Sequence, residues 1–294
     1  PCILWDRLGG CEAAGQQCGL FSEFHAVQYW NCREENIDSL VLCHRPCRRS
    51  YRLSDGGFAG YAFSKGGVIA ITGTNGKTTT TALTGQIMRD WFPSVFVVGN
   101  IGNPYTREAL NTREDSVTVA EISSFQLETT EHFHPAVSAI LNITPDHLNR
   151  HHTMENYVAV KESLTKNQTK EDTCVLNYED PYTRAFGERC PASVIWFSSA
   201  RKLTEGYYLE GEEIFRCFAG VTEKLLNIHE MQLIGTHNVE NVMAAIAMSA
   251  AYGVPMPNIL YTVKHFQAVE HRIEYVATKN GVAYYNDSKG TNPD

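Results

Sequence analysis

A glycine-rich turn at residues 73–79, with the sequence GTNGKTT, constrains the fold of this chain more than any other segment. It follows the apolar run at residues 68–71, which is typical of a buried parallel strand, and it leads into a stretch at residues 78–90 that suits a helix. Backbone N–H groups and a helix N-terminus bind phosphate in such a turn, so we predict a nucleotide site here. The predicted nucleotide-binding residues of the turn are Gly73, Thr74, Asn75, Gly76, Lys77, Thr78 and Thr79.

Two side chains of this turn have separate predicted tasks. The ammonium of Lys77 would reach the β- and γ-phosphate oxygens, and the hydroxyl of Thr78 would bind Mg²⁺. The general phosphate-loop motif has four residues between its glycines, whereas here Ile71 stands at the first glycine position and the glycine is Gly73. An ordinary strand–helix turn is the alternative, and the order of strand, Gly-Lys-Thr and helix disfavours it.

Strand-like and helix-like stretches alternate along the rest of the chain. This order predicts an α/β fold with a doubly wound, mostly parallel sheet. The predicted strands lie at residues 95–98, 117–120, 136–143, 173–176, 193–197 and 282–285, with a hairpin in residues 206–228. The predicted helices lie at residues 154–170, 238–252 and 257–266.

Composition excludes some functions and marks out one end of the chain. The net charge of −8 over 294 residues argues against a general nucleic-acid binder. The sequence contains no run of 18 apolar residues, so it does not predict a membrane span. Residues 1–65 lack clear periodicity and hold six of the nine cysteines, without a C-x-x-C pair that would favour zinc. Two interpretations remain for this leader, a divergent first domain or an out-of-frame stretch, and the pattern favours the second.

The turn at residues 73–79 resembles the phosphate loop of the Mur ligases, which are ATP-dependent enzymes that add amino acids to the peptidoglycan precursor. Folylpolyglutamate synthetases share a variant of this loop. The sequence EISSFQLE at residues 121–128 resembles the corresponding segment in the branch of the family that adds D-glutamate to UDP-N-acetylmuramoyl-L-alanine. Further similar blocks follow in family order, and the resemblance covers residues 66–294.

The resemblance implies metal and substrate roles for four residues outside the turn. Glu121 would help to bind Mg²⁺, Asn100 would face the precursor, and His147 would organise a second metal ion and the substrate. Lys161 would be carbamylated, which converts an ammonium into an anion that can bind Mg²⁺. Without the resemblance, Lys161 would be interpreted as a solvated helix lysine.

The remaining blocks imply contacts with the nucleotide. Asn241 would contact the adenine, while the residue alone predicts that Asn238 caps the helix at residues 238–252. Arg272 would act on the γ-phosphate, Asp287 would bond the ribose hydroxyls and Lys289 would lie near the phosphates. The implied catalytic residues are Lys77, His147, Lys161 and Arg272, and the implied metal ligands are Thr78, Glu121, His147 and Lys161.

The resemblance also implies an enzyme and its organisation. The reaction would consume ATP with two Mg²⁺ ions, pass through an acyl phosphate, and take place in the cytoplasm on a monomer with no nucleic-acid or membrane partner. Residues 1–65 would be an unassigned leader or an aberrant remnant of the UDP-binding domain, residues 66–270 the central ATP-binding domain, and residues 271–294 the start of a truncated Rossmann-like domain. A nucleotide-binding module without ligase activity, or another Mur or folylpolyglutamate-type ligase, are the alternatives.

Overall fold

The computed structural model describes residues 59–267, 269, 272 and 274–288, together with four short strands nearer the N-terminus. These strands are β1 (Ile3–Trp5), β2 (Cys11–Ala13), β3 (Gln28–Asn31) and β4 (Asp38–Val41). β1 pairs with β2 and β3 with β4, both antiparallel, inside a compact unit that spans Pro1–Tyr51. The sequence did not predict them, because strands of three or four residues are too short to show an alternating pattern.

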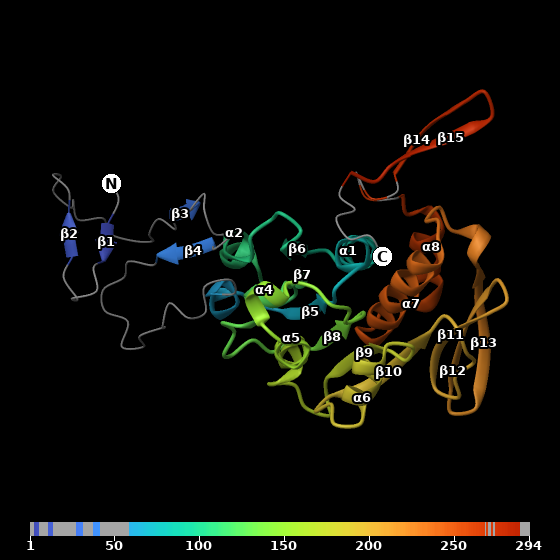
Figure 1. Cartoon of the computed structure of the whole chain (residues 1–294), viewed down its shortest axis with the longest axis horizontal. Helices are drawn as coiled ribbons and strands as arrows, with labels where there is room; N and C mark the ends of the chain where they lie inside the picture. Colours follow the sequence, from blue (N-terminus) through green and yellow to red (C-terminus); the bar gives the residue numbers. More distant parts are fainter. Residues whose placement is uncertain are drawn as a thin grey trace. The chain divides into compact units, whose positions relative to one another are not determined.

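The second compact unit, Arg52–Asp294, contains a nine-stranded sheet in the order β13-β12-β11-β10-β9-β8-β5-β7-β6 (Figure 1). All pairs from β6 to β11 are parallel, and β12 and β13 continue the sheet antiparallel. The doubly wound, mostly parallel fold is therefore confirmed. The strands are β5 (Gly67–Thr72), β6 (Val95–Gly99), β7 (Val117–Glu121), β8 (Val137–Ile140), β9 (Thr173–Asn177), β10 (Ser193–Ser198), β11 (Gly206–Glu210), β12 (Glu213–Phe218) and β13 (Val221–Asn227).

Helices cover both faces of this sheet. The longer helices α1 (Lys77–Trp91), α7 (Thr236–Ala251) and α8 (Met256–His265) contact one another and share one hydrophobic core with Ile69 and Ile71 of β5. Val68 and Ala70 point into a second core on the opposite face. The helical elements of the rest of this unit are η2 (Ala59–Phe63), α2 (Tyr105–Glu108), η3 (Ala109–Asn111), α3 (Ser124–Leu127), α4 (Leu148–His151), α5 (Met154–Glu162), η4 (Ser163–Thr165), α6 (Pro181–Gly187) and η5 (Ile228–Glu230). Because both sides of each central strand are buried, the strands are continuous apolar runs.

Three predicted boundaries were wrong, and at two of them a polar side chain bonds the backbone. β8 ends at Ile140, since Asn142 turns away to bind the neighbouring glycine-rich loop. The helix expected to reach residue 170 leaves α-helical geometry after Glu162, where the hydroxyl of Ser163 bonds the carbonyl of Val160. α7 begins at Thr236 with Gly235 as its N-cap, so the predicted cap residue lies within the first turn.

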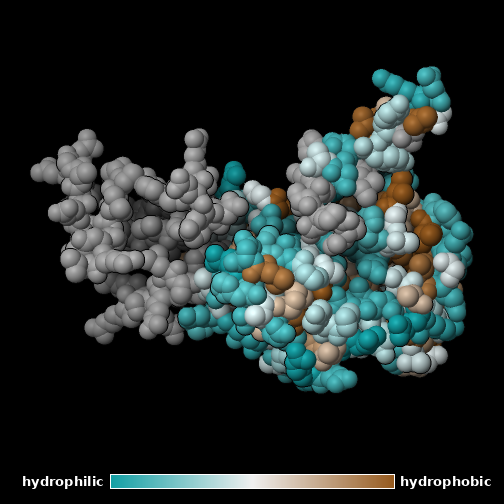
Figure 2. All heavy atoms as spheres, in the orientation of Figure 1, coloured by the Kyte–Doolittle hydropathy of each residue, from teal (hydrophilic) through white to brown (hydrophobic). Residues whose placement is uncertain are grey.

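The C-terminal part of the described chain is an antiparallel hairpin of β14 (Glu274–Lys279) and β15 (Val282–Asn286). The sequence predicted β15 but not β14. Val276 and Val282 are 60% and 55% exposed, and hydrophobic residues gather on this hairpin and over α8 (Figure 2). Among the helices that the structure describes, none is both long and apolar enough to span a membrane.

Candidate functional site

The glycine-rich loop connects β5 to α1 as the sequence predicted. Gly76 is the N-cap of α1 and has a φ of 82°, a left-handed conformation that glycine adopts without strain. The side chain of Asn142 fastens the loop, because its Oδ1 accepts hydrogen bonds from the backbone N–H groups of Thr74 (3.1 Å) and Asn75 (2.8 Å). No role was predicted for Asn142, and its position near the carboxyl end of a predicted strand is the one signal that could have indicated one.

Two lysines meet at the carbonyl oxygen of Gly73. Lys77 Nζ donates to this oxygen (3.0 Å) and to that of Thr74 (2.8 Å), and Lys161 Nζ donates to the same Gly73 oxygen (2.7 Å). Lys161 is only 1% exposed and its ammonium lies 4.7 Å from the centre of the Tyr157 ring. The interpretation of Lys161 as a solvated helix lysine is therefore wrong.

The electrostatics of these lysines follow from their burial. Burial, reinforced by the charge of Lys77, lowers the pKa of Lys161 well below its usual value, and the carboxylate of Asp146 only partly opposes this. Burial also lowers the pKa of Lys77, against the charges of Glu121 and Asp146. An amine with a lowered pKa is more often neutral and so more nucleophilic.

Glu121 ends β7 and is 1% exposed. Its Oε1 accepts a hydrogen bond from Asn100 Nδ2 (2.9 Å), whereas its buried Oε2 has no hydrogen-bond partner among the described residues. A buried carboxylate oxygen without a partner is costly, and a bound cation would satisfy it. The site therefore fits the predicted Mg²⁺.

This carboxylate does not make a metal site by itself. Within the described parts of the chain, no three His, Cys, Asp or Glu side chains gather closely enough to hold a metal ion. A divalent ion beside Glu121 would need further oxygens, which Thr78, a modified Lys161 or a nucleotide phosphate could supply.

His147 lies at the N-cap of α4 with a φ of 52°, a left-handed conformation that is rare outside glycine. Its side chain is 48% exposed, with Nε2 3.4 Å from Asp146 Oδ2 and the ring 4.8 Å from that of Phe125. Asp146 acts electrostatically on both Lys77 and Lys161, so this segment faces the same site.

Asn241 lies on α7 directly against the glycine-rich loop. It is 5% exposed, its Nδ2 donates to Asn238 Oδ1 (3.1 Å), and its Oδ1 accepts from Thr80 Oγ1 (3.3 Å). A Cβ atom on Gly76 would lie 2.1 Å from the same Oδ1. The adenine contact stays a prediction, but the support that Asn241 gives the loop was not foreseen.

The predicted residues near the C-terminus differ in how well they can be placed. The charge of Arg272 lowers the pKa of Lys77, so Arg272 lies close to the loop, and its buried Nε has no hydrogen-bond partner within the described chain. Asp287 is exposed directly after β15. Lys289 lies outside the described residues, and its role stays a prediction.

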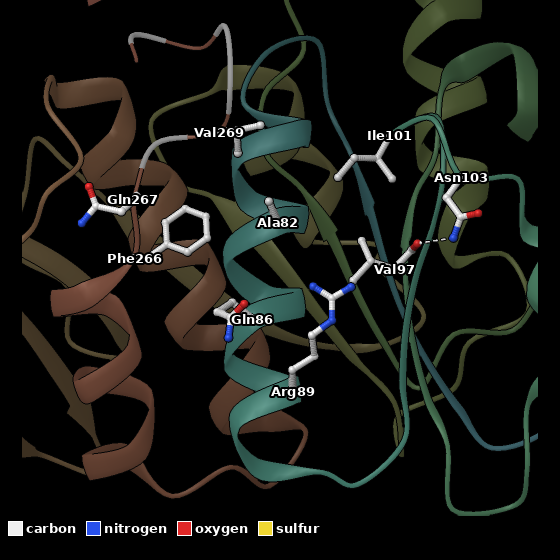
Figure 3. Close-up of a pocket in the computed structure, with 9 residues that line it drawn as sticks. All are labelled: Ala82, Gln86, Arg89, Val97, Ile101, Asn103, Phe266, Gln267 and Val269. Carbon is white, nitrogen blue, oxygen red and sulfur yellow. Dashed lines mark hydrogen bonds between the residues drawn. The ribbon is translucent and has the colours of Figure 1, made fainter. Parts of the chain in front are cut away.

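A separate groove of about 470 Å³ lies beside α1 (Figure 3). Gln86 and Arg89 of α1 line it, with Ile101 and Asn103 after β6 and Phe266 after α8. None of residues 73–79 contributes to it.

The described cysteine side chains are free and buried, at Cys174, Cys190 and Cys217. The six cysteine side chains near the N-terminus, whose spacing disfavours a zinc site, lie outside the described part.

Sheet order, loop position and the gathered charges define a phosphate-loop α/β domain. Residues 71–249 match the family described as the Mur ligase middle domain, and the chain belongs to the Mur ligase family. The predicted family is therefore confirmed.

The relatives agree in name. The chain is 64% identical over 234 residues to the UDP-N-acetylmuramoylalanine–D-glutamate ligase of Lachnospira eligens, which covers 80% of this chain and 52% of that protein. It is 49% identical over 228 residues to the ligase of the same name from Clostridioides difficile, covering 77% and 50%. The chain thus spans about half the length of the curated relatives it matches.

Solved structures share the fold at low identity. The MurF of Acinetobacter baumannii matches with a TM-score of 0.61 at 18% identity, covering 80% of this chain and 54% of that one. The MurF ligase of Thermotoga maritima in complex with ADP matches with a TM-score of 0.58 at 20% identity, covering 80% and 55%. At such identities the likeness shows the fold alone.

Proposed function

We propose that this chain carries the ATP-binding and carboxylate-activating centre of a ligase that adds D-glutamate to UDP-N-acetylmuramoyl-L-alanine. The observation that carries the proposal is the convergence of Lys77 and Lys161 on Gly73 O, with the buried carboxylate of Glu121 acting on Lys77. The 64% identity to a ligase with this name supports the choice of substrate.

The proposed reaction has two steps. The carboxylate of UDP-N-acetylmuramoyl-L-alanine attacks the γ-phosphorus of ATP, which gives an acyl phosphate and ADP. The amine of D-glutamate then attacks the acyl carbon, an amide bond forms, the amine loses a proton and inorganic phosphate leaves. Since little of this chemistry needs a protein nucleophile, the protein positions reactants and balances charge.

We assign the phosphates to the loop and to two cations. The backbone N–H groups of residues 73–79 would surround the phosphates at the N-terminus of α1. Lys77 would exchange its two backbone carbonyls for phosphate oxygens, which are stronger acceptors because they are charged. Arg272 would bond the γ-phosphate. For the rest of the nucleotide we retain Asn241 at the adenine, Asp287 at the ribose and Lys289 near the phosphates.

Four side chains would serve metal binding. Glu121, Thr78, His147 and a carbamylated Lys161 would hold up to two Mg²⁺ ions, which supply positive charge between the anionic reactants. Asn100 holds the Glu121 carboxylate by a hydrogen bond and would also face the precursor.

Carbamylation of Lys161 has a physical basis in its surroundings. The neutral amine attacks CO₂ and releases a proton, so a lowered pKa favours the reaction. The product is an anion, which would replace the repulsion between the two ammonium groups by attraction to Lys77.

The organisation of the protein is proposed along the same lines. Residues 66–270 would be the central domain and residues 271–294 the first part of a following one, with residues 1–65 as a leader or remnant of the UDP-binding domain. We propose a monomer that acts in the cytoplasm.

Calorimetric titration with ATP and MgCl₂ tests the nucleotide site. We expect binding that weakens at least about tenfold in Lys77→Ala, since a charged hydrogen bond is worth roughly 1.5–3 kcal/mol. Lys202→Ala, at an exposed surface ion pair with Glu210, should bind like the original chain. An unchanged affinity of Lys77→Ala for ATP would overturn the assignment of the nucleotide site.

A phosphate-release assay with D-glutamate and UDP-N-acetylmuramoyl-L-alanine tests the ligase. Because the chain spans about half of its relatives, we expect nucleotide binding without turnover. Turnover equal to that of an intact ligase would contradict this expectation. Binding by this chain, with no turnover even when the missing half of a relative is added, would favour a nucleotide-binding module instead.

A further inference from the structure

A short helix follows each of two proposed metal-binding residues. Glu121 lies three residues before α3 (Ser124–Leu127), and His147 directly precedes α4 (Leu148–His151). Neither helix is long enough to hold its own position by internal hydrogen bonds. Since Glu121 is held in β7 of the sheet, the contacts of α4 with α3 decide how His147 lies relative to it.

His151 joins these helices through both of its ring nitrogens. Nε2 lies 2.9 Å from Ser124 Oγ, and Nδ1 lies 3.3 Å from Glu128 Oε1. His151 is 4% exposed and Ser124 is 3% exposed. Burial lowers the pKa of His151, although the Glu128 charge opposes it, and the two ring nitrogens face a hydroxyl on one side and a carboxylate on the other.

Arg150 makes a second connection at the same place. Its guanidinium bonds both oxygens of Glu128, the shortest contact being 2.8 Å, and it lies 5.0 Å from the centre of the Phe125 ring. Phe125 also contacts the His147 ring at 4.8 Å. Glu128 and Phe125 thus both contact the α4 segment.

The connection continues to the glycine-rich loop. The His151 ring lies 5.1 Å from that of Tyr157, whose hydroxyl is 3.2 Å from Thr74 Oγ1. The left-handed backbone of His147 is unfavourable by itself and needs such surroundings to persist.

We propose that His151 and Glu128 are positioning residues that hold His147 at the metal site, facing Glu121. The proposal rests on the proposed function, because it assumes that His147 binds a metal ion beside the nucleotide. The Ser–His–Glu order also occurs in hydrolytic triads, but the buried hydroxyl of Ser124 offers no access to a substrate. Its contact with His151 Nε2 serves the connection between α3 and α4.

The test measures Mn²⁺ affinity of the 294-residue chain at saturating ADP, by electron paramagnetic resonance. We expect His151→Gln and Glu128→Gln each to weaken Mn²⁺ binding about tenfold, as loss of outer-shell support does at metal sites. The affinity for ADP without metal should not change, whereas a general packing defect would lower this affinity as well. His132→Gln and Glu188→Gln, at exposed positions, are the matched controls.

A double-mutant cycle separates positioning from simple packing. If His151 acts through His147, then His151→Gln adds no further loss of Mn²⁺ affinity to His147→Ala. Losses that multiply, or a His147→Ala variant with unchanged Mn²⁺ affinity, would overturn the proposal. If His151→Gln does not fold, Ser124→Ala takes its place in the cycle, with the same outcomes. If substitution of Lys77 weakens Mn²⁺–ADP binding and substitution of His151 does not, this inference alone is overturned. If the chain does not bind ADP at all, the proposed function is overturned.

Discussion

Lys161 Nζ donates a 2.7 Å hydrogen bond to the carbonyl oxygen of Gly73, 88 residues earlier in the chain. This bond fixes a buried amine of α5 to the glycine-rich loop, within reach of the charge of Lys77. The loop and the helix are therefore one site, although the sequence separates them widely. The chemistry of the site depends on whether this amine is protonated, neutral or carbamylated.

Carbamylation of Lys161 is the first prediction. In ¹³C-bicarbonate we expect a carbamate resonance that grows as pH rises through the lowered pKa, because only the neutral amine reacts. Lys161→Arg should abolish the signal, and the exposed-site variant Lys202→Arg should keep it. A signal that persists in Lys161→Arg would assign the carbamate to another amine.

The same lowered pKa links stability to pH. Between the lowered pKa of folded Lys161 and the usual 10.5, the unfolded chain binds the proton and the folded chain does not. The free energy of unfolding should therefore rise with pH across this window in CO₂-free buffer, relative to Lys161→Met. Urea titrations of both proteins at several pH values measure the difference, and parallel pH profiles would refute the assignment.

Gly76 provides the third prediction. Alanine there would combine a left-handed backbone with a Cβ atom 2.1 Å from Asn241 Oδ1, so we expect Gly76→Ala to lose about 3 kcal/mol of unfolding free energy. Gly211 has a φ of 64° but no atom within 4 Å of the added Cβ, so Gly211→Ala should lose only about 1 kcal/mol. Equal losses in urea unfolding would show that the contact with Asn241 costs nothing.

Much of the sheet could be predicted because buried parallel strands are continuous apolar runs. β13 (Val221–Asn227) could not, since only Leu225 and Leu226 in it are buried and the rest looks like a polar loop. α6 (Pro181–Gly187) was missed because it is short, although Asp180 caps it by accepting two backbone N–H bonds.

The site was predicted to the extent that it follows the ends of strands. Glu121 and the loop lie at the carboxyl ends of neighbouring parallel strands, which meet at one edge of the sheet. The burial of Lys161 and Asn241 was not predictable, because it comes from contacts with Gly73 and Gly76 that no local pattern encodes.

The fourth prediction concerns the support of Glu121 by Asn100. Asn100→Ala removes the donor to Glu121 Oε1, so we expect Mn²⁺ binding at saturating ADP to weaken about tenfold. Asn103→Ala is the matched control, since this side chain bonds the Val97 carbonyl in the same loop. If both variants bind Mn²⁺ equally well, Asn100 does not act through the carboxylate.

The last prediction separates two roles of Asn241. The amide of Asn241 is buried against Gly76 and accepts a hydrogen bond from Thr80. We therefore expect Asn241→Ala to weaken the binding of tripolyphosphate, which has no base, about as much as the binding of ATP. The loss should be about five- to thirtyfold, as for one or two neutral hydrogen bonds of roughly 1 kcal/mol each. Thr78→Val, within the loop but without this contact, gives the comparison for a direct loop defect. Competition titrations measure all three ligands, with GTP as the third. If tripolyphosphate binding is unchanged while the preference for ATP over GTP disappears, Asn241 contacts the adenine, and its contact with the loop does not contribute to phosphate binding.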